Sequence, residues 1–201
     1  MSIATRLRAL ARGTTRADAE VDKAVAPLRK TAPVRALAVV SELGDQPQLR
    51  LISSALIVIG LASSNGRLSR AGARMLIAHE LATIAKGFVK DRVDRTRPRS
   101  ARSASQRKIR PGQSKAKEKT SFPSGHSAGA VAVARAFGRE YPEHRPAALA
   151  AAGAIAAAQI PRCAHYLTDV GAGVLVGSAA EAVSNLVWPL AAEDRPETAR
   201  N

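Results

Sequence analysis

Six apolar segments constrain the fold of this chain more than any other feature of its sequence. They cover residues 34–43, 49–64, 70–91, 127–138, 146–160 and 169–190, and the breaks between them contain Gly or Pro beside polar residues. Ala is abundant in these segments and only 3% of the chain is aromatic, which favours closely packed helices over a β-sandwich. A chain of 201 residues has room for one domain. The sequence therefore predicts an all-α fold, an antiparallel bundle of about six helices.

Polar segments flank the predicted bundle. We expect a polar N-terminal segment over residues 1–30, the bundle over 31–190 and a polar C-terminal tail over 191–201. The N-terminal segment has no continuous apolar stretch, so it does not resemble a secretory signal peptide, and a polar or amphipathic helix is the simpler interpretation. Within the bundle, the strongly basic stretch 99–120 is predicted to be a solvated flexible loop.

Hydropathy leaves two environments open for this bundle. Segment 169–190 has the length of about 20 residues that a spanning helix needs, and segment 49–64 is strongly apolar. Small residues line the segments, as they do at packed helix interfaces inside membranes. The mean hydropathy of the whole chain is only -0.09, however. We predict a membrane-embedded bundle, with a soluble Ala-rich bundle as the alternative.

The charge and the cysteine content limit the function classes. A formal net charge of +15 attracts anions, whether nucleic acid, acidic lipid headgroups or phosphorylated substrates. Cys163 is the single cysteine, which excludes an intrachain disulfide and a four-cysteine zinc site. Because aromatic side chains for base stacking are nearly absent, recognition of single-stranded nucleic acid is disfavoured.

Three polar clusters lie where the predicted helices begin or end. The first contains Lys90 and Arg97, the second is the stretch "PSGH" at residues 123–126, and the third contains His165 and Asp169, four residues apart. In an antiparallel bundle the third helix ends on the face where the fourth begins, and the fifth returns to that face. All three clusters are therefore predicted to meet at one end of the bundle.

The residue types in these clusters suit a tetrahedral oxyanion. Lys90 and Arg97 are cationic donors, and the guanidinium can hold two phosphate oxygens at once. Ser124 offers a hydroxyl, and Gly125 lets a backbone N–H approach an oxyanion without a Cβ in the way. The positive end of the following helix adds to the attraction. Ser127 is predicted to cap that helix rather than to react.

The two histidines of the clusters have separable tasks. His165, oriented by Asp169, can act as a nucleophile toward phosphorus, and His126 can act as a general acid for the leaving oxygen. Ester cleavage that is divided into a phosphohistidine step and a hydrolysis step requires no metal. We therefore predict no metal site and no cofactor.

Taken together, the clusters resemble the signature of the type 2 phosphatidic acid phosphatase superfamily, which reads Lys-x6-Arg-Pro, Pro-Ser-Gly-His and Ser-Arg-x5-His-x3-Asp. Residues 90–98 and 123–126 match the first two parts fully, and residues 165–169 match the end of the third. The resemblance implies a helical bundle in which His165 attacks phosphorus, Asp169 orients it and His126 protonates the leaving group. It also implies that the phosphate is held by Lys90, Arg97, Ser124 and Gly125.

The chain departs from this signature in its third part. The arginine of the family falls on Gln159, which is preceded by Ala158 where serine is usual, and Arg162 lies only three residues before His165. Gln159 can donate hydrogen bonds but carries no charge. We expect Arg162 to replace the missing arginine in part, so both Gln159 and Arg162 belong to the predicted phosphate-binding set.

The sequence thus predicts a metal-independent phosphatase that acts on a phosphomonoester or diphosphate through a phosphohistidine. The resemblance implies a membrane lipid as substrate, such as phosphatidic acid, phosphatidylglycerol phosphate or polyprenyl diphosphate, and a multi-pass protein of the bacterial inner membrane. It implies a site on the outer face, whereas the basic loop 99–120 favours the inner face. The expected partners are the lipid and the membrane, with no specific nucleic acid. The alternatives are a non-enzymatic basic protein that binds acidic membrane or nucleic acid, and a soluble nonspecific acid phosphatase.

Overall fold

The computed structural model of the chain describes residues 15–103 and 105–189. Each of the six apolar segments overlaps one α-helix: α2 (Ala32–Ser41), α3 (Gln46–Ala62), α4 (Gly66–Lys90), α5 (Gly125–Glu140), α6 (Arg145–Ala158) and α7 (Leu167–Val187). A further helix covers residues 15–25. Short 3-10 turns cover Ala26–Lys30, Glu42–Gly44, Pro98–Ser100, Lys117–Lys119 and Pro142–His144, and the strands β1 (Val93–Asp94) and β2 (Arg110–Pro111) form one small antiparallel pair. The predicted all-α antiparallel bundle is confirmed.

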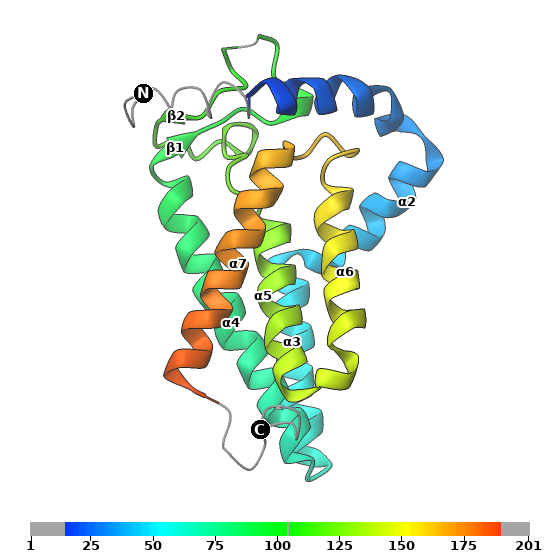
Figure 1. Ribbon diagram of the computed structural model, residues 1–201, viewed down its shortest axis with the longest axis vertical. Coiled ribbons are helices and arrows are strands. Elements are labelled where there is room, and N and C mark those ends of the chain that lie inside the picture. The colour runs from blue at the N-terminus through cyan, green and yellow to red at the C-terminus, as the bar shows by residue number, and fades with distance from the viewer. Residues whose placement is uncertain (1–14, 104, 190–201) are drawn as a thin grey trace, which may run out of the picture.

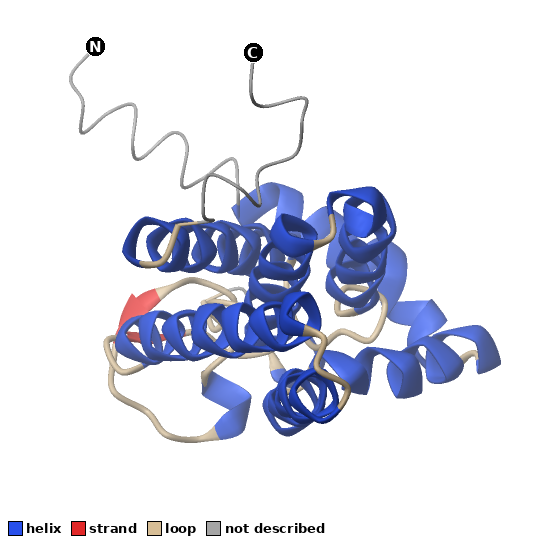
Figure 2. Cartoon of the chain, turned by 90° about the horizontal axis from the view of Figure 1, so that it is seen from below, coloured by secondary structure: helices blue, strands red, loops and turns tan. Residues whose placement is uncertain are grey.

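Helix α5 is the centre of this bundle. It packs against α4, α6 and α7, and α3 packs mainly against α4 and less extensively against α5. Figure 1 shows α3 to α7 running along the long axis of the molecule, and Figure 2 shows the same helices end-on. The helix over residues 15–25, dark blue in Figure 1, lies across one end of the bundle, beside β1 and β2.

Small side chains set the distance between α5 and α7. A Cβ at Gly173 would lie 2.5 Å from the backbone oxygen of Ser124, and a Cβ at Gly177 would lie 2.3 Å from that of Ala128. Any side chain at either position would collide with the backbone of α5. Glycine therefore lets the two helices pack backbone to backbone, and this contact places the start of α7 beside the start of α5.

The first turn of α5 differs from its predicted form. Ser124, not Ser127, is the N-cap, and its Oγ accepts a hydrogen bond from the backbone N–H of Ser127 at 3.4 Å. The prediction for Ser127 was wrong because the helix begins at Gly125, two residues before the apolar segment. Ser124 is the last residue with extended backbone, where a capping hydroxyl reaches the free N–H groups of the first turn.

The basic stretch 99–120 is not simply a solvated loop. Its backbone carbonyls at Lys119 and Glu118 accept hydrogen bonds from the backbone N–H groups of Arg95 and Arg97, both at 2.8 Å. The pairing of β1 with β2 adds a second attachment. These bonds hold the stretch over the end of the bundle, next to the helix over residues 15–25.

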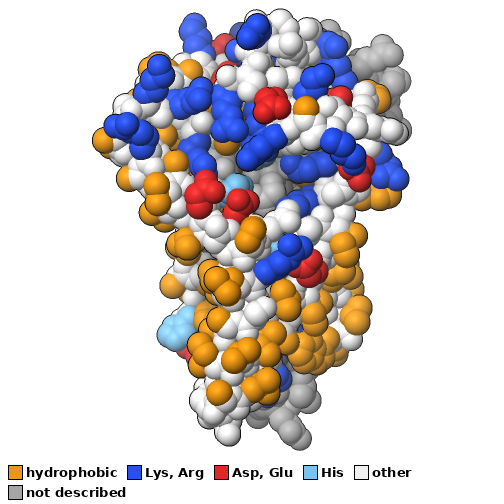
Figure 3. Space-filling view, turned by 180° about the vertical axis from the view of Figure 1, so that it is seen from behind, with side chains coloured by type: hydrophobic (Ala, Val, Ile, Leu, Met, Phe, Trp, Pro, Cys, Tyr) orange, Lys and Arg blue, Asp and Glu red, His pale blue; other side chains and the backbone are white. Residues whose placement is uncertain are grey.

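The surface divides into two zones. In Figure 3, Lys and Arg side chains gather at the end of the molecule that carries β1 and β2, and hydrophobic side chains cover the remaining length. The exposed large hydrophobic residues of this zone include Leu51, Val58 and Leu61 of α3, Ile84 and Phe88 of α4, and Leu175 and Leu186 of α7. Among the described residues, α7 is the one helix that is both long and apolar enough to cross a membrane.

We predict that Gly177→Val destabilises the bundle by about 1–3 kcal/mol, because the new side chain forces α7 away from α5. Thermal unfolding of the purified protein measures the change. The control is Gly171→Val on the same helix, where an added Cβ meets nothing within 4 Å. Equal unfolding temperatures of the two variants would show that the close contact of α5 and α7 contributes no stability.

Candidate active site

A cavity of about 260 Å³ opens at the basic end of the bundle. All three predicted clusters contribute to its wall, although they are separated by many residues in the sequence. The lining residues come from α4 (Lys86, Lys90), from the basic segment after it (Arg97, Arg99, Lys117), from α5 (Gly125, His126), from the connection between α6 and α7 (Gln159, Arg162, Ala164, His165), and from the turn before α3 and the first residue of α3 (Glu42, Asp45, Gln46). Ser124 and Asp169 are buried behind this wall.

His165 lies between Arg97 and Asp169. Its Nε2 is 3.2 Å from Nη1 of Arg97, and its Nδ1 is 3.7 Å from Oδ2 of Asp169, beyond hydrogen-bond distance. Only 2% of the residue is exposed. Burial lowers the pKa of His165 to about 4, and the charge of Arg97 acts in the same direction, whereas Asp169 opposes both. The ring is therefore neutral at pH 7, which is the form that can act as a nucleophile.

The carboxylate of Asp169 is completely buried and hydrogen-bonded on both oxygens. Oδ1 accepts from Nη1 of Arg95 at 2.5 Å, and Oδ2 accepts from Oγ of Ser121 at 2.5 Å and from the backbone N–H of Tyr166 at 3.0 Å. These donors fix the carboxylate at the first turn of α7. Its orientation next to His165 is thus set by Arg95 of the first cluster, by Ser121 just before the second, and by Tyr166 of the third.

Backbone carbonyls hold two of the cavity cations in place. Nζ of Lys90 donates to the carbonyl of Thr120 at 2.6 Å, and Arg97 donates from Nε to Lys117 at 2.8 Å and from Nη1 to Ala164 at 3.1 Å. Burial lowers the pKa of Arg97 below its usual range, and the nearby charge of Arg99 adds to this. Both cations keep further N–H groups for an anion in the cavity.

In the second cluster, Gly125 lines the cavity, whereas the hydroxyl of Ser124 does not. Oγ of Ser124 lies 2.8 Å from Oγ of Ser127, and Ser124 does not line the cavity. Gly125 does line it, at the first position of α5. A Cβ at Gly125 would lie 3.1 Å from Nζ of Lys86. The structure thus places Gly125 where the sequence predicted a phosphate contact and leaves the hydroxyl of Ser124 to the helix cap.

The arginine of the family signature falls on Gln159, which carries no charge. Arg162, three residues before His165, supplies a positive charge nearby. Gln159 is buried, and its Nε2 donates to the carbonyl of Ile155 one helical turn back, at 3.0 Å. Nη2 of Arg162 is 2.6 Å from Oε1 of Glu42, and Nη1 donates to Oγ of Ser41. Both Gln159 and Arg162 line the cavity. The amide is engaged within its own helix, whereas the guanidinium is held at the wall.

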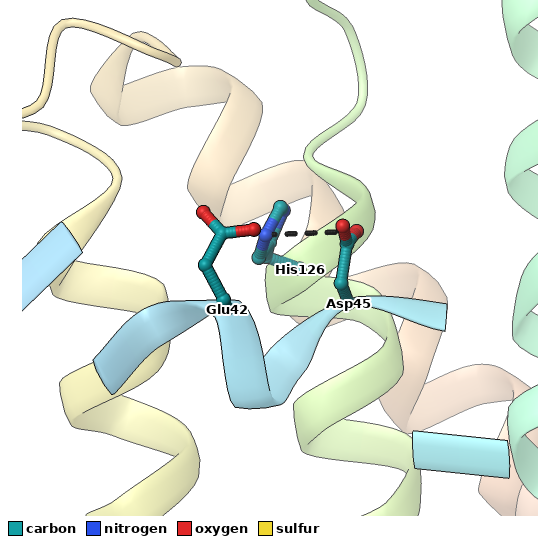
Figure 4. A group of neighbouring side chains, drawn as sticks. All are labelled: Glu42, Asp45 and His126. Carbon is teal, nitrogen blue, oxygen red and sulfur yellow. Dashed lines mark ion pairs between the residues drawn. The ribbon is translucent and has the colours of Figure 1, made fainter. Parts of the chain in front are cut away.

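Two carboxylates stand beside His126. Figure 4 shows the ring between Glu42 and Asp45, with Nε2 of His126 3.6 Å from Oδ1 of Asp45. Within the described part of the chain, these three residues are the one group that could hold a metal ion, since their ligand atoms lie within 4.8 Å of one another. Arg162 already pairs with Glu42 and would compete with such an ion. Burial lowers the pKa of His126, and the charges of Asp45 and Glu42 oppose that shift.

Sequence reasoning missed several residues of this site. Lys86 could have been found, because it precedes Lys90 by one helical turn and so shares its face. Arg95 was one arginine among many in its segment, and nothing in the sequence linked it to Asp169. Glu42 and Asp45 precede the first cluster by more than 40 residues and belong to no motif.

The comparisons with known proteins agree with this arrangement. A family model described as the PAP2 superfamily matches residues 71–191, which is more than half of the chain. The crystal structure of LpxE from Aquifex aeolicus superposes with a TM-score of 0.59 at 18% identity, over 82% of this chain and 92% of that one. The first transmembrane PAP2-type phosphatidylglycerolphosphate phosphatase from Bacillus subtilis superposes with a TM-score of 0.58 at 18% identity, over 86% of this chain and 84% of that one. At such identities the likeness shows a shared fold. No curated protein matches the chain by sequence.

We predict that the ring of His165 titrates near pH 4, because burial and Arg97 both disfavour the imidazolium. NMR of protein labelled with ¹⁵N in its histidine rings measures the titration, and His165→Asn identifies the signals by removing them. A midpoint near the ordinary value of about 6.5 would mean that the ring is solvated and that the site is not closed around it.

Proposed function

The chain belongs to the PAP2 superfamily and is a phosphoric ester hydrolase, and on this premise we propose that it cleaves a phosphorylated membrane lipid through a phosphohistidine at His165. The observation that carries the proposal is the cavity itself. It brings together a buried neutral imidazole, a second histidine beside two carboxylates, and six lysine or arginine side chains. A phosphate ester fits this set, because the cations bind its oxygens, the neutral imidazole attacks phosphorus and the second histidine protonates the leaving group.

In the first step, the phosphoryl group occupies the cavity in contact with Arg97 and Nε2 of His165. Nε2 attacks phosphorus, and the bond from phosphorus to the ester oxygen breaks. The departing oxygen takes a proton from His126. Burial lowers the pKa of this ring, and the charge of Asp45 opposes that shift. Asp169 stabilises the positive charge that forms on the ring of His165.

In the second step, water attacks the phosphohistidine. The neutral ring of His126 accepts a proton from this water, the bond from phosphorus to nitrogen breaks, and inorganic phosphate forms. His165 returns to its neutral state, which its burial favours. No part of the cycle needs a metal ion, because side chains supply both the proton transfers and the positive charge.

The cations of the cavity supply the stabilisation of the phosphoryl oxygens. Lys86 adds to the predicted set, since only 6% of it is exposed and it makes no hydrogen bond or ion pair within the described part of the chain. Its Nζ lies beside Gly125, at the N-terminus of α5. Lys86 and the backbone N–H of Gly125 are thus placed to bind one oxygen together.

The two surface zones support a membrane location. The exposed apolar side chains of α3, α4 and α7 match the environment of lipid tails, and the basic end matches anionic headgroups (Figure 3). We infer that the bundle is inserted as a multi-pass protein of the bacterial inner membrane. The cavity, at the basic end, then lies at headgroup depth, where the phosphate of a lipid reaches it.

We predict that His126→Ala lowers the first-turnover rate with an alkyl phosphate far more than with p-nitrophenyl phosphate, because the nitrophenolate leaves without a proton. General acid catalysis contributes about 10²–10⁴-fold, so the ratio of the two rates changes by up to that factor. Release of the leaving group in the first turnover, in detergent and excess chelator, measures both rates apart from the hydrolysis of the phosphohistidine, in which His126 also acts.

The control for this experiment is His165→Ala, which removes the nucleophile and is expected to abolish both rates equally. Loss of the wild-type activity in chelator, with recovery on addition of Mg²⁺, would contradict the proposed mechanism. An equal effect of His126→Ala on both substrates would remove the general acid role from His126.

We predict that Arg162→Ala lowers kcat by about 10²–10³-fold, the usual cost of removing one donor to a developing oxyanion. Gln159→Arg in the same background is expected to restore part of the rate, because it returns a cation to the position of the family arginine. Steady-state rates of the two variants and their combination test this. A harmless Arg162→Ala would show that Glu42 and Ser41 hold Arg162 for a structural purpose.

A further inference from the structure

The helix over residues 15–25 reaches into the buried part of the active site. Asp18 is 2% exposed, although the N-terminal segment is polar and lies outside residues 71–191, which match the family model. Asp18, Val21, Asp22 and Val25 share one face of the helix, at the spacing i, i+3, i+4 and i+7. This face lies against the segment that contains His165, Tyr166 and Leu167.

The carboxylate of Asp18 binds two residues that determine the position of Asp169. Its Oδ2 accepts from Nη2 of Arg95 at 2.5 Å and from Oγ1 of Thr168 at 2.5 Å, and its Oδ1 accepts from the backbone N–H of Thr168 at 3.0 Å. Arg95 uses its other terminal nitrogen, Nη1, for Asp169, also at 2.5 Å. The guanidinium therefore lies between two buried carboxylates.

We propose that Asp18 is a positioning residue for the phosphatase reaction, which holds Arg95 on Asp169 and thereby sets Asp169 against His165. The inference rests on the function proposed above. Two contacts support it independently. The bond to Arg95 fixes the donor of Asp169, and the bond to the N–H of Thr168 fixes the first turn of α7, on which Asp169 stands.

Charge gives a second reason for this role. Arg95 is 3% exposed, so without Asp18 its positive charge would face Asp169 alone. Asp169 would then be less available to the imidazolium that forms on His165 in the reaction. Two carboxylates around one guanidinium give this group of three a net negative charge, which opposes the positive charge of Arg97 as charge develops on the ring of His165.

The test compares Asp18→Asn with Glu20→Gln. Both remove one negative charge from the same helix, but Glu20 is exposed. We expect Asp18→Asn to lower kcat on the order of 10–100-fold, the range seen when an outer partner that orients a ligand is removed, with KM changed less than about twofold. The ¹⁵N ring resonances of His165 are expected to shift in Asp18→Asn and not in Glu20→Gln.

A purely structural Asp18 would give a lower unfolding temperature with unchanged kcat and unchanged His165 resonances, and this result overturns the proposal. Thr168→Val covers the case in which Asp18→Asn does not fold, because it removes the hydroxyl that donates to Asp18 and accepts from Arg95 and keeps the charge of Asp18. A smaller drop of kcat with a shifted His165 resonance supports the proposal, and no change in either overturns it. If the wild-type protein releases no phosphate, the proposed function is contradicted. The ring resonances of His165 still test whether Asp18 positions Asp169.

Discussion

The buried carboxylate of Asp169 is the charge on which the rest of this site depends. A carboxylate without solvent is stable only if donors surround it, and here the donors come from three separate parts of the sequence. Arg95 belongs to the segment after α4, Ser121 precedes α5, and Tyr166 precedes α7. The backbone carbonyl of Asp169 also accepts from the N–H of Ser124. One buried acid thus joins the three clusters into a single site.

The scaffold and the site share the same interface. Gly173 and Gly177 allow α7 to touch the backbone of α5, and the bond between Asp169 and Ser124 lies at the end of that contact. A wider separation of the two helices would break the bond and move Gly125 away from His165. The small residues of α7 therefore help to place the residues of the site, although none of them lines the cavity. Their effect comes from distance alone.

The cations that line the cavity repel one another, and an anionic ligand reduces this repulsion. Lysine and arginine side chains line it from several elements, and only Glu42 and Asp45 supply negative charge at the wall. Mutual repulsion of the cations disfavours the empty site, so an anion that enters relieves it. Fixed cations and the N-terminus of α5 also need little rearrangement as charge develops on phosphorus. Both properties favour a phosphorylated ligand.

Much of this protein follows from its sequence alone. Apolar segments with small residues determined six helices and their antiparallel order, and this order brought Lys90, His126 and His165 to one end, since helix direction depends only on where the breaks fall. The tertiary structure decided what those patterns do not encode. Asp18 and Asp45 belong to no motif, and they reach Arg95 and His126 only because the segments that carry them fold back over the bundle. Such contacts depend on the packing of distant segments, which no local pattern of residues records.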